Sequence, residues 1–166
     1  MEDSPDLKFR RIHENVRYHF DFLFNRGFRI TSATFAGRGT ESWQAIMMAG
    51  NRIIRIHSDR GKVDLALSTL QLFDEIGLFD LDSMAQHVGQ GKEPSPVPEA
   101  ERMNEVQQLE RVARLLEKYF DDIFAQFERS NFLIPDRLSF SDLLQQNRAT
   151  VLGQLPGFFS AAGFWL

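Results

Sequence analysis

The apolar positions near the start of the chain recur at helical spacing and switch to alternation at Phe28. Ser4 and Pro5 form a helix-start signal, because a serine side chain can cap free N–H groups and proline is tolerated in the first turn. Gly27 suits the left-handed residue that closes a helix. We expect one helix from about residue 5 to 25 with these residues on its buried face: Leu7, Ile12, Val16, Phe20 and Leu23.

Strand-like runs follow this helix at residues 28–33, 43–49, 52–58 and 62–68, and the first and last of them alternate with a period of two. Gly50 and Asn51 predict a two-residue turn between the second and third runs, since both residues tolerate positive φ. The pattern predicts an antiparallel meander of three or four strands with the first helix packed on one face. The expected fold class is α+β.

The short stretch Asp59, Arg60 and Gly61 separates the last two runs and allows two interpretations. It is either a charged site or a tight hairpin turn. A turn of this kind needs an aspartate that bonds its own backbone and a glycine that supplies the left-handed position. We favour the turn.

Beyond the expected sheet, the apolar residues within 70–81 are predicted to cover its end, and a short helix at 81–88 is capped by Asp80 or Asp82. Glycine and proline then dominate as far as Pro98, which is the composition of a linker. We divide the chain into an α+β domain at 1–90, a linker at 91–98 and a helical region at 99–166.

A long helix is expected from Glu99 to Phe127, because apolar residues there recur three and four positions apart. Further apolar residues widen this stripe beyond the seam of a two-stranded coiled coil, so we expect it to pack on helices of its own chain or of a second copy. We favour a homodimer. A helix at 139–155 and an aromatic tail at 157–166 are expected to cover part of the stripe. The candidate interface residues are Val112, Leu116, Tyr119, Phe120, Ile123, Phe124, Phe127 and Trp165.

The cysteine content and the apolar segments of the chain indicate in which compartment it works and whether it contacts a membrane. The chain has no cysteine, which excludes disulfides, thiolate metal sites and a cysteine nucleophile. The N-terminus lacks the apolar core of a signal peptide, and the apolar run at 158–166 is too short to span a bilayer. We expect a cytoplasmic protein with no membrane partner.

Charge is distributed unevenly along the chain. Residues 1–62 hold 11 Lys and Arg against 7 Asp and Glu, or +4, whereas residues 63–166 hold 8 against 16, or −8, which together give the net charge of −4. Such polarity can steer a partner or hold two subunits in register, but we favour the simpler explanation of two solvated faces with no partner.

No motif predicts catalysis, a metal or a cofactor. His13 and His19 lie about 240° apart around a helix, so they cannot share a zinc site on one face. There is no Gly-x-Ser-x-Gly elbow and no phosphate loop. The basic residues of the expected sheet are the candidate patch for an anionic ligand, and without interleaved aromatics they do not point to nucleic acid. They are Arg29, Arg52, Arg55, Arg60 and Lys62.

A resemblance adds one functional expectation. The phenylalanine-rich first helix, Gly27-Phe28, the "DRG" of residues 59–61 and the "LFDL" of residues 78–81 resemble small uncharacterised bacterial proteins. Some of these are similar in layout to immunity proteins of contact-dependent and polymorphic toxin systems. The resemblance covers Leu7 to Val88 and implies a protein-binding role with no catalytic residue.

Three hypotheses follow. The first is a non-enzymatic protein-binding, immunity-like or regulatory protein. The second is a small enzyme or binding protein for an anionic ligand, acting through the basic residues of the sheet. The third is a structural module for homo-oligomerisation.

Overall fold

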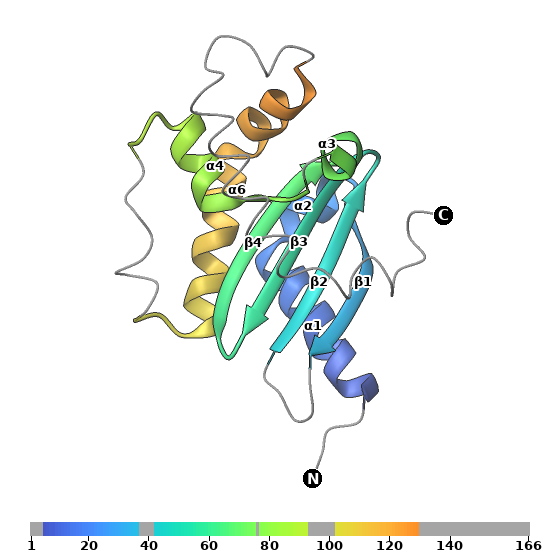
Figure 1. The fold of residues 1–166 in the computed structure, drawn as a ribbon. Coiled ribbons are helices and arrows are strands. Elements are labelled where there is room, and N and C mark those ends of the chain that lie inside the picture. Colours follow the sequence, from blue (N-terminus) through green and yellow to red (C-terminus); the bar gives the residue numbers. More distant parts are fainter. Residues whose placement is uncertain (1–4, 37–41, 76, 93–101, 130–166) are drawn as a thin grey trace.

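The fold is an antiparallel sheet with most of its helices packed on one face, seen in a computed structural model that describes residues 5–36, 42–75, 77–92 and 102–129 (Figure 1). The helices are α1 (Pro5–His19), α2 (Asp21–Asn25), α3 (Leu70–Glu75), α4 (Leu81–Val88) and α6 (Glu105–Glu128). The strands are β1 (Arg29–Ala36), β2 (Ser42–Ala49), β3 (Arg52–Asp59), β4 (Lys62–Thr69) and β5 (Phe79–Asp80). The expected α+β class is therefore confirmed.

The sheet is a meander of five strands in the order β1-β2-β3-β4-β5, with every neighbouring pair antiparallel. The four long strands match the four strand-like runs of the sequence. The fifth strand was not expected, because it has only two residues and so carries no period. It pairs with the middle of β4 at Ala66 and Leu67.

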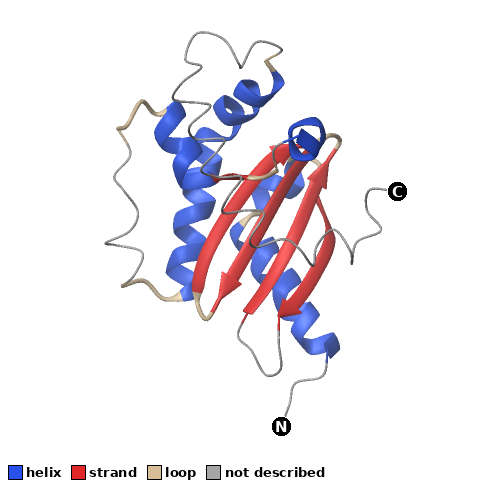
Figure 2. Ribbon diagram, in the orientation of Figure 1, coloured by secondary structure: helices blue, strands red, loops and turns tan. Residues whose placement is uncertain are grey.

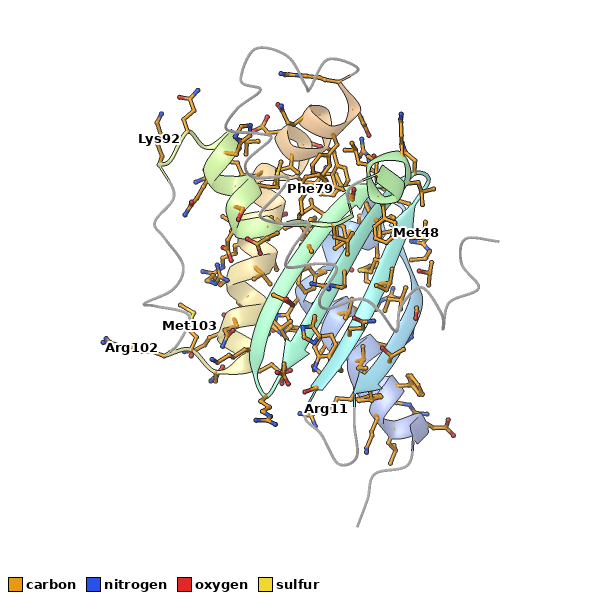
Figure 3. All side chains as sticks on the ribbon, viewed as in Figure 1. Arg11, Met48, Phe79, Lys92, Arg102 and Met103 are labelled. Carbon is orange, nitrogen blue, oxygen red and sulfur yellow. The ribbon has the colours of Figure 1, made fainter. Side chains whose placement is uncertain are left out.

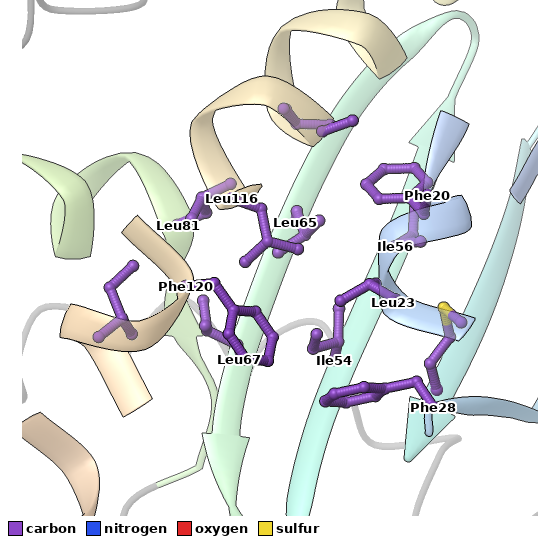
Figure 4. Packing of buried hydrophobic residues seen from close by; sticks show 14 of the residues in the cluster. Phe20, Leu23, Phe28, Ile54, Ile56, Leu65, Leu67, Leu81, Leu116 and Phe120 are labelled. Carbon is purple, nitrogen blue, oxygen red and sulfur yellow. The ribbon is translucent and has the colours of Figure 1, made fainter. Parts of the chain in front are cut away.

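Helices α1 and α2 lie behind the sheet in the view of Figure 2, and α6 lies along its β4 side with α4 beside it. Alternation in the strands directs one set of side chains toward these helices. Figure 4 shows Leu23 and Phe28 near Ile54, and Phe120 of α6 near Leu67 of β4. Together these elements bury a single large hydrophobic cluster that runs from Ile12 to Phe127.

Helix α6 belongs to this same core. The division expected at 91–98 therefore does not separate two cores, because the apolar stripe of α6 packs on β4 and α4. The helix begins at Glu105 and not at Glu99, since Asn104 caps it in a reciprocal box with Gln107. Val106, an apolar residue within the range expected for the long helix, is exposed. The expected helix at 139–155 and the tail at 157–166 lie outside the described residues.

The first helix is interrupted at Phe20, where the backbone has φ −119° and ψ 31°, and not continuous to Asn25 as expected. The interruption turns the chain so that Phe20, Leu23 and Phe28 are all fully buried. Gly27 has φ +87° and closes the segment, as predicted.

The face of the sheet opposite α1 and α6, called the second face here, has a smaller apolar cluster. It combines strand residues with residues that follow β4, namely Ile46, Ile53, Ala66, Phe73 and Leu78. Helix α3 lies at the upper end of this face in Figure 1, which agrees with the expectation that residues 70–81 cover the end of the sheet. None of the helices in the described ranges is long and apolar enough to cross a membrane.

The stretch Asp59 to Lys62 is a two-residue hairpin turn, as we expected. Asp59 pairs with Lys62 across it, and the two residues between them have positive φ, 51° at Arg60 and 81° at Gly61. Both values suit the type of turn that matches the twist of a β-hairpin.

Replacing Gly61 with valine should lower the free energy of unfolding by about 1–3 kcal/mol, because a β-branched residue is strained at positive φ. No atom lies within 4 Å of a Cβ built there, so the cost comes from the backbone and not from a clash. Chemical denaturation of Gly61→Val and of Gly61→Asn measures this, since asparagine tolerates the left-handed region. Equal stability of the two variants would contradict the assigned turn.

Candidate functional site: the edges and second face of the sheet

The basic residues proposed as an anion patch do not gather in one place. Arg52 lies at one end of β3, whereas Arg60 and Lys62 lie at the other, about 26 Å away at the rise of an extended strand. Arg55 is in the middle of β3 and is only 3% exposed. Arg29 starts β1 and donates to the carbonyl oxygens of residues 24 and 28. The sheet therefore presents no single basic patch made of all these residues.

The two arginines within β3 also have structural partners. The Arg52 guanidinium lies 4.8 Å from the Phe124 ring centroid and 2.8 Å from the Glu128 carboxylate, so it joins β3 to the end of α6. Arg55 contacts Asp64 on the neighbouring strand, with 3.4 Å between Nη2 and Oδ2. These contacts fasten elements together and leave Arg52 and Arg55 less suited to a ligand.

A cross-strand polar group on the second face is the nearest approach to a catalytic arrangement. His57 Nδ1 lies 3.0 Å from Asp64 Oδ1, and both side chains are about one-third exposed, at 31% and 39%. A carboxylate can orient an imidazole in this way for base catalysis. The hydroxyls of Ser58 and Ser68 on the same strands, however, donate to Glu105 and to the carbonyl of Thr69. This group is best explained as a cross-strand pair, and the described residues contain no metal-binding cluster.

Asp80 is a half-buried carboxylate with a structural role. Its side chain accepts hydrogen bonds from the backbone N–H and the hydroxyl of Ser83, each at 2.9 Å, and so caps α4. Burial raises the pKa of Asp80, and the carboxylates of Asp82 and Asp64 add to the rise, while the Ser83 bonds oppose it. Of the two candidate caps, the structure selects Asp80, because Asp82 binds Arg111 instead, at 2.7 Å.

The β4 edge of the sheet is closed by a side chain from α6. Beside β4, the two-residue β5 reaches only Ala66 and Leu67. At the start of β4 and in the turn before it, the Gln108 amide takes over: Gln108 Oε1 accepts from the Val63 N–H at 2.8 Å, and Gln108 Nε2 donates to the Gly61 carbonyl at 2.9 Å. The buried amide thus takes hydrogen bonds that a further strand would otherwise make.

A second polar contact fixes the start of α6 on the sheet. The Glu105 carboxylate accepts from the Trp43 indole N–H at 2.8 Å and from the Ser58 hydroxyl at 2.6 Å. Sequence reasoning missed both Glu105 and Gln108. The signal was present, since Asn104 and Gln107 form the N-x-x-Q pattern of a capping box that sets where α6 begins.

The opposite edge, β1, differs from the β4 edge. Within the described residues β1 pairs only with β2, so one side of an eight-residue strand has no strand partner. Natural proteins protect such edges with lysine, proline or short length. The strand sequence RITSATFA has none of these. Its one irregularity is a bulge between Ile30 and Ser32, and the register is regular from Ser32 to Ala36.

The candidate interface residues of α6 are engaged inside the chain. Seven of the eight form the buried stripe that packs on β4 and α4, and Trp165 lies outside the described residues. The reason is geometric, because β4, β5 and α4 supply the apolar cover that we had assigned in part to other helices. This stripe therefore gives no support for a homodimer. The seven are Val112, Leu116, Tyr119, Phe120, Ile123, Phe124 and Phe127.

Comparison of the chain with protein-family models, with curated proteins and with solved structures gave no significant match.

Replacing Gln108 with alanine should lower the free energy of unfolding by about 2–4 kcal/mol, because the Val63 N–H and the Gly61 carbonyl lose their buried partner. The control is Gln126→Ala, a partly exposed glutamine on the same helix, for which the change should stay within about 1 kcal/mol. Urea denaturation at equal protein concentration compares them. Equal losses for the two variants would mean that the Gln108 amide does not close the β4 edge.

Replacing Asp80 with asparagine should change how stability depends on pH. Asparagine keeps the capping acceptor but carries no charge. The pKa of Asp80 is raised on folding. The wild-type protein therefore loses stability as pH rises from the unfolded pKa, about 3.9, through the folded pKa, because the carboxylate ionises less readily in the native state. The free energy of unfolding of Asp80→Asn minus that of the wild type should thus increase with pH and then level off. Denaturation between pH 3 and 8 measures it, with the exposed Asp122→Asn as control; a difference that falls with rising pH would contradict the assignment.

Proposed function

We propose that the protein is a non-enzymatic protein-binding module whose partner adds a strand to β1. The observation that carries this proposal is the asymmetry of the sheet. The β4 edge is occupied by β5 and by the Gln108 amide, whereas no described residue pairs with the outer side of β1. An exposed strand edge supplies main-chain hydrogen bonds for an added strand and alternate side chains for specificity.

The resemblance to immunity proteins favours the same class of function, because those proteins act by binding another protein. An immunity-like or regulatory role in the cytoplasm is therefore part of the proposal. Binding of an anionic small molecule has less support, since the basic residues assigned to it are spread over both ends of the sheet. Homodimerisation loses the argument based on α6, and its one remaining support is the same β1 edge.

The proposal can be tested with the full-length chain as bait and a phage-displayed library of random 12-residue peptides as the probe. Adjacent residues of a strand direct their N–H groups to opposite sides, so one of Ala33 and Thr34 points its N–H away from β2. Proline at that residue removes an outward donor and keeps pairing with β2. Of the variants Ala33→Pro and Thr34→Pro, we expect one to keep a melting temperature within a few degrees of wild type.

The folded proline variant should bind the selected peptides at least about tenfold more weakly than wild type, because a strand added to β1 would lose a main-chain bond and meet the ring. Fluorescence anisotropy with labelled peptides measures the dissociation constants. If the folded variant binds as tightly as wild type, or if no peptide is recovered above background, strand addition at β1 is wrong.

A further inference from the structure

Helix α1 has two unequal flanks beside its buried stripe of Ile12 and Val16. One flank faces α6: burial lowers the pKa of His19, and Glu110 of α6 opposes that change through its charge. Helix α6 lies on the β4 side of the sheet, as Figure 1 shows, so the other flank of α1 faces the β1 side. That second flank carries Arg10, His13 and Arg17, which are three and four residues apart and exposed.

The basic flank continues onto the start of β1. The Arg17 guanidinium lies 5.4 Å from the Phe24 ring centroid, and Arg29 Nη1 donates to the Phe24 carbonyl oxygen at 3.2 Å. Arg17 and Arg29 therefore approach the same residue from α1 and from β1. Within the residues that the structure describes, Arg10, Arg17 and Arg29 make no ion pair, although Asp6 lies at the outer end of the same flank.

The other end of the β1 edge is apolar. The rings of Phe9 on α1 and Phe35 on β1 contact edge to face, with centroids 5.5 Å apart. Phe9 is 39% exposed and the nearby Leu7 is 53% exposed. The edge thus offers main-chain donors and acceptors, with Arg17 and Arg29 at one end and, at the other, Arg10 next to a partly exposed aromatic pair.

From this placement we infer that the β1 edge takes an acidic, extended segment of a partner protein, with carboxylates next to Arg10, Arg17 and Arg29 and an apolar residue next to Phe9 and Phe35. This inference rests on the proposed function and names the chemistry of the partner. Opposite charge across an interface speeds association and rejects partners of the wrong sign.

A second copy of the chain fits the edge less well. Antiparallel pairing of β1 with β1 about a twofold axis would bring the basic flank of each α1 close to that of its neighbour. Residues 5–36 hold six Lys and Arg against three Asp and Glu, so both sides of that contact would be positive. Such a contact is opposed by like charge, whereas an acidic segment is attracted.

The charge preference is tested by sequencing the peptides recovered from the same random library with the full-length chain as bait. The expected peptides carry a net negative charge and alternate apolar with acidic residues. Their affinity should fall when salt is raised from 50 to 300 mM, because exposed charges are screened over about 10 Å at 0.1 M salt. If the recovered peptides are neutral or basic and still bind the folded proline variant more weakly than wild type, the charge preference is wrong. Strand addition at β1 would still be supported.

The variant Arg10→Gln/Arg17→Gln should bind these peptides about tenfold more weakly, since one exposed ion pair changes a binding constant by up to about fivefold. The matched control is Arg102→Gln/Arg114→Gln, which removes the same charge from exposed sites before and on α6 and should leave the affinity unchanged; Figure 3 shows Arg102 pointing away from the body of the protein. Equal losses of affinity in the two double variants would mean that binding depends only on the net charge of the protein. That result would overturn the inferred role of Arg10 and Arg17. Sedimentation showing a wild-type dimer that the folded proline variant abolishes would instead identify a second copy as the occupant.

Discussion

Packing of α6 across β4 is the interaction on which the rest of the fold depends. The sheet has one face that must be removed from water, and α1 with α2 covers only the part of it near β1, β2 and β3. The half near β4 is covered by the apolar stripe of α6, where Leu116 and Phe120 are at most 1% exposed. Burial of each such side chain contributes about 1.5–3 kcal/mol, against a total stability of about 5–15 kcal/mol for a typical domain. Loss of this packing would leave no net stability.

The same docking determines which edge of the sheet remains available. Apolar contacts bring α6 alongside β4, and only there can Gln108 reach Val63 and Gly61. The polar contacts of Glu105 with Trp43 and Ser58 then fix the helix along its axis. Core packing thus closes one edge as a by-product, and no equivalent side chain of α1 bonds to β1 among the described residues. The difference between the edges is set by one helix.

Alternation and turn chemistry predicted most of the local structure. The positions of the long strands, the turn at Arg60 and Gly61 and the closing role of Gly27 all follow from backbone preferences that act within a few residues. The two-residue β5 and the interruption at Phe20 could not be predicted in this way, because both depend on what the chain meets in the core. The candidate anion patch was the least well predicted feature. Arg52, Arg60 and Lys62 are near one another in sequence, but the length of β3 places them at opposite ends of the sheet.

The position of Gln108 in the sequence determines when, during synthesis, the β4 edge becomes closed to pairing with other chains. Gln108 is 45 residues beyond Val63, whose N–H it accepts, so the hairpin of β3 and β4 emerges from the ribosome well before its cover does. During that interval the growing sheet presents two strand edges to other chains in the cell. A slow or incomplete arrival of α6 would therefore expose newly made molecules to edge-to-edge association at β4, a hazard that the finished protein no longer carries there.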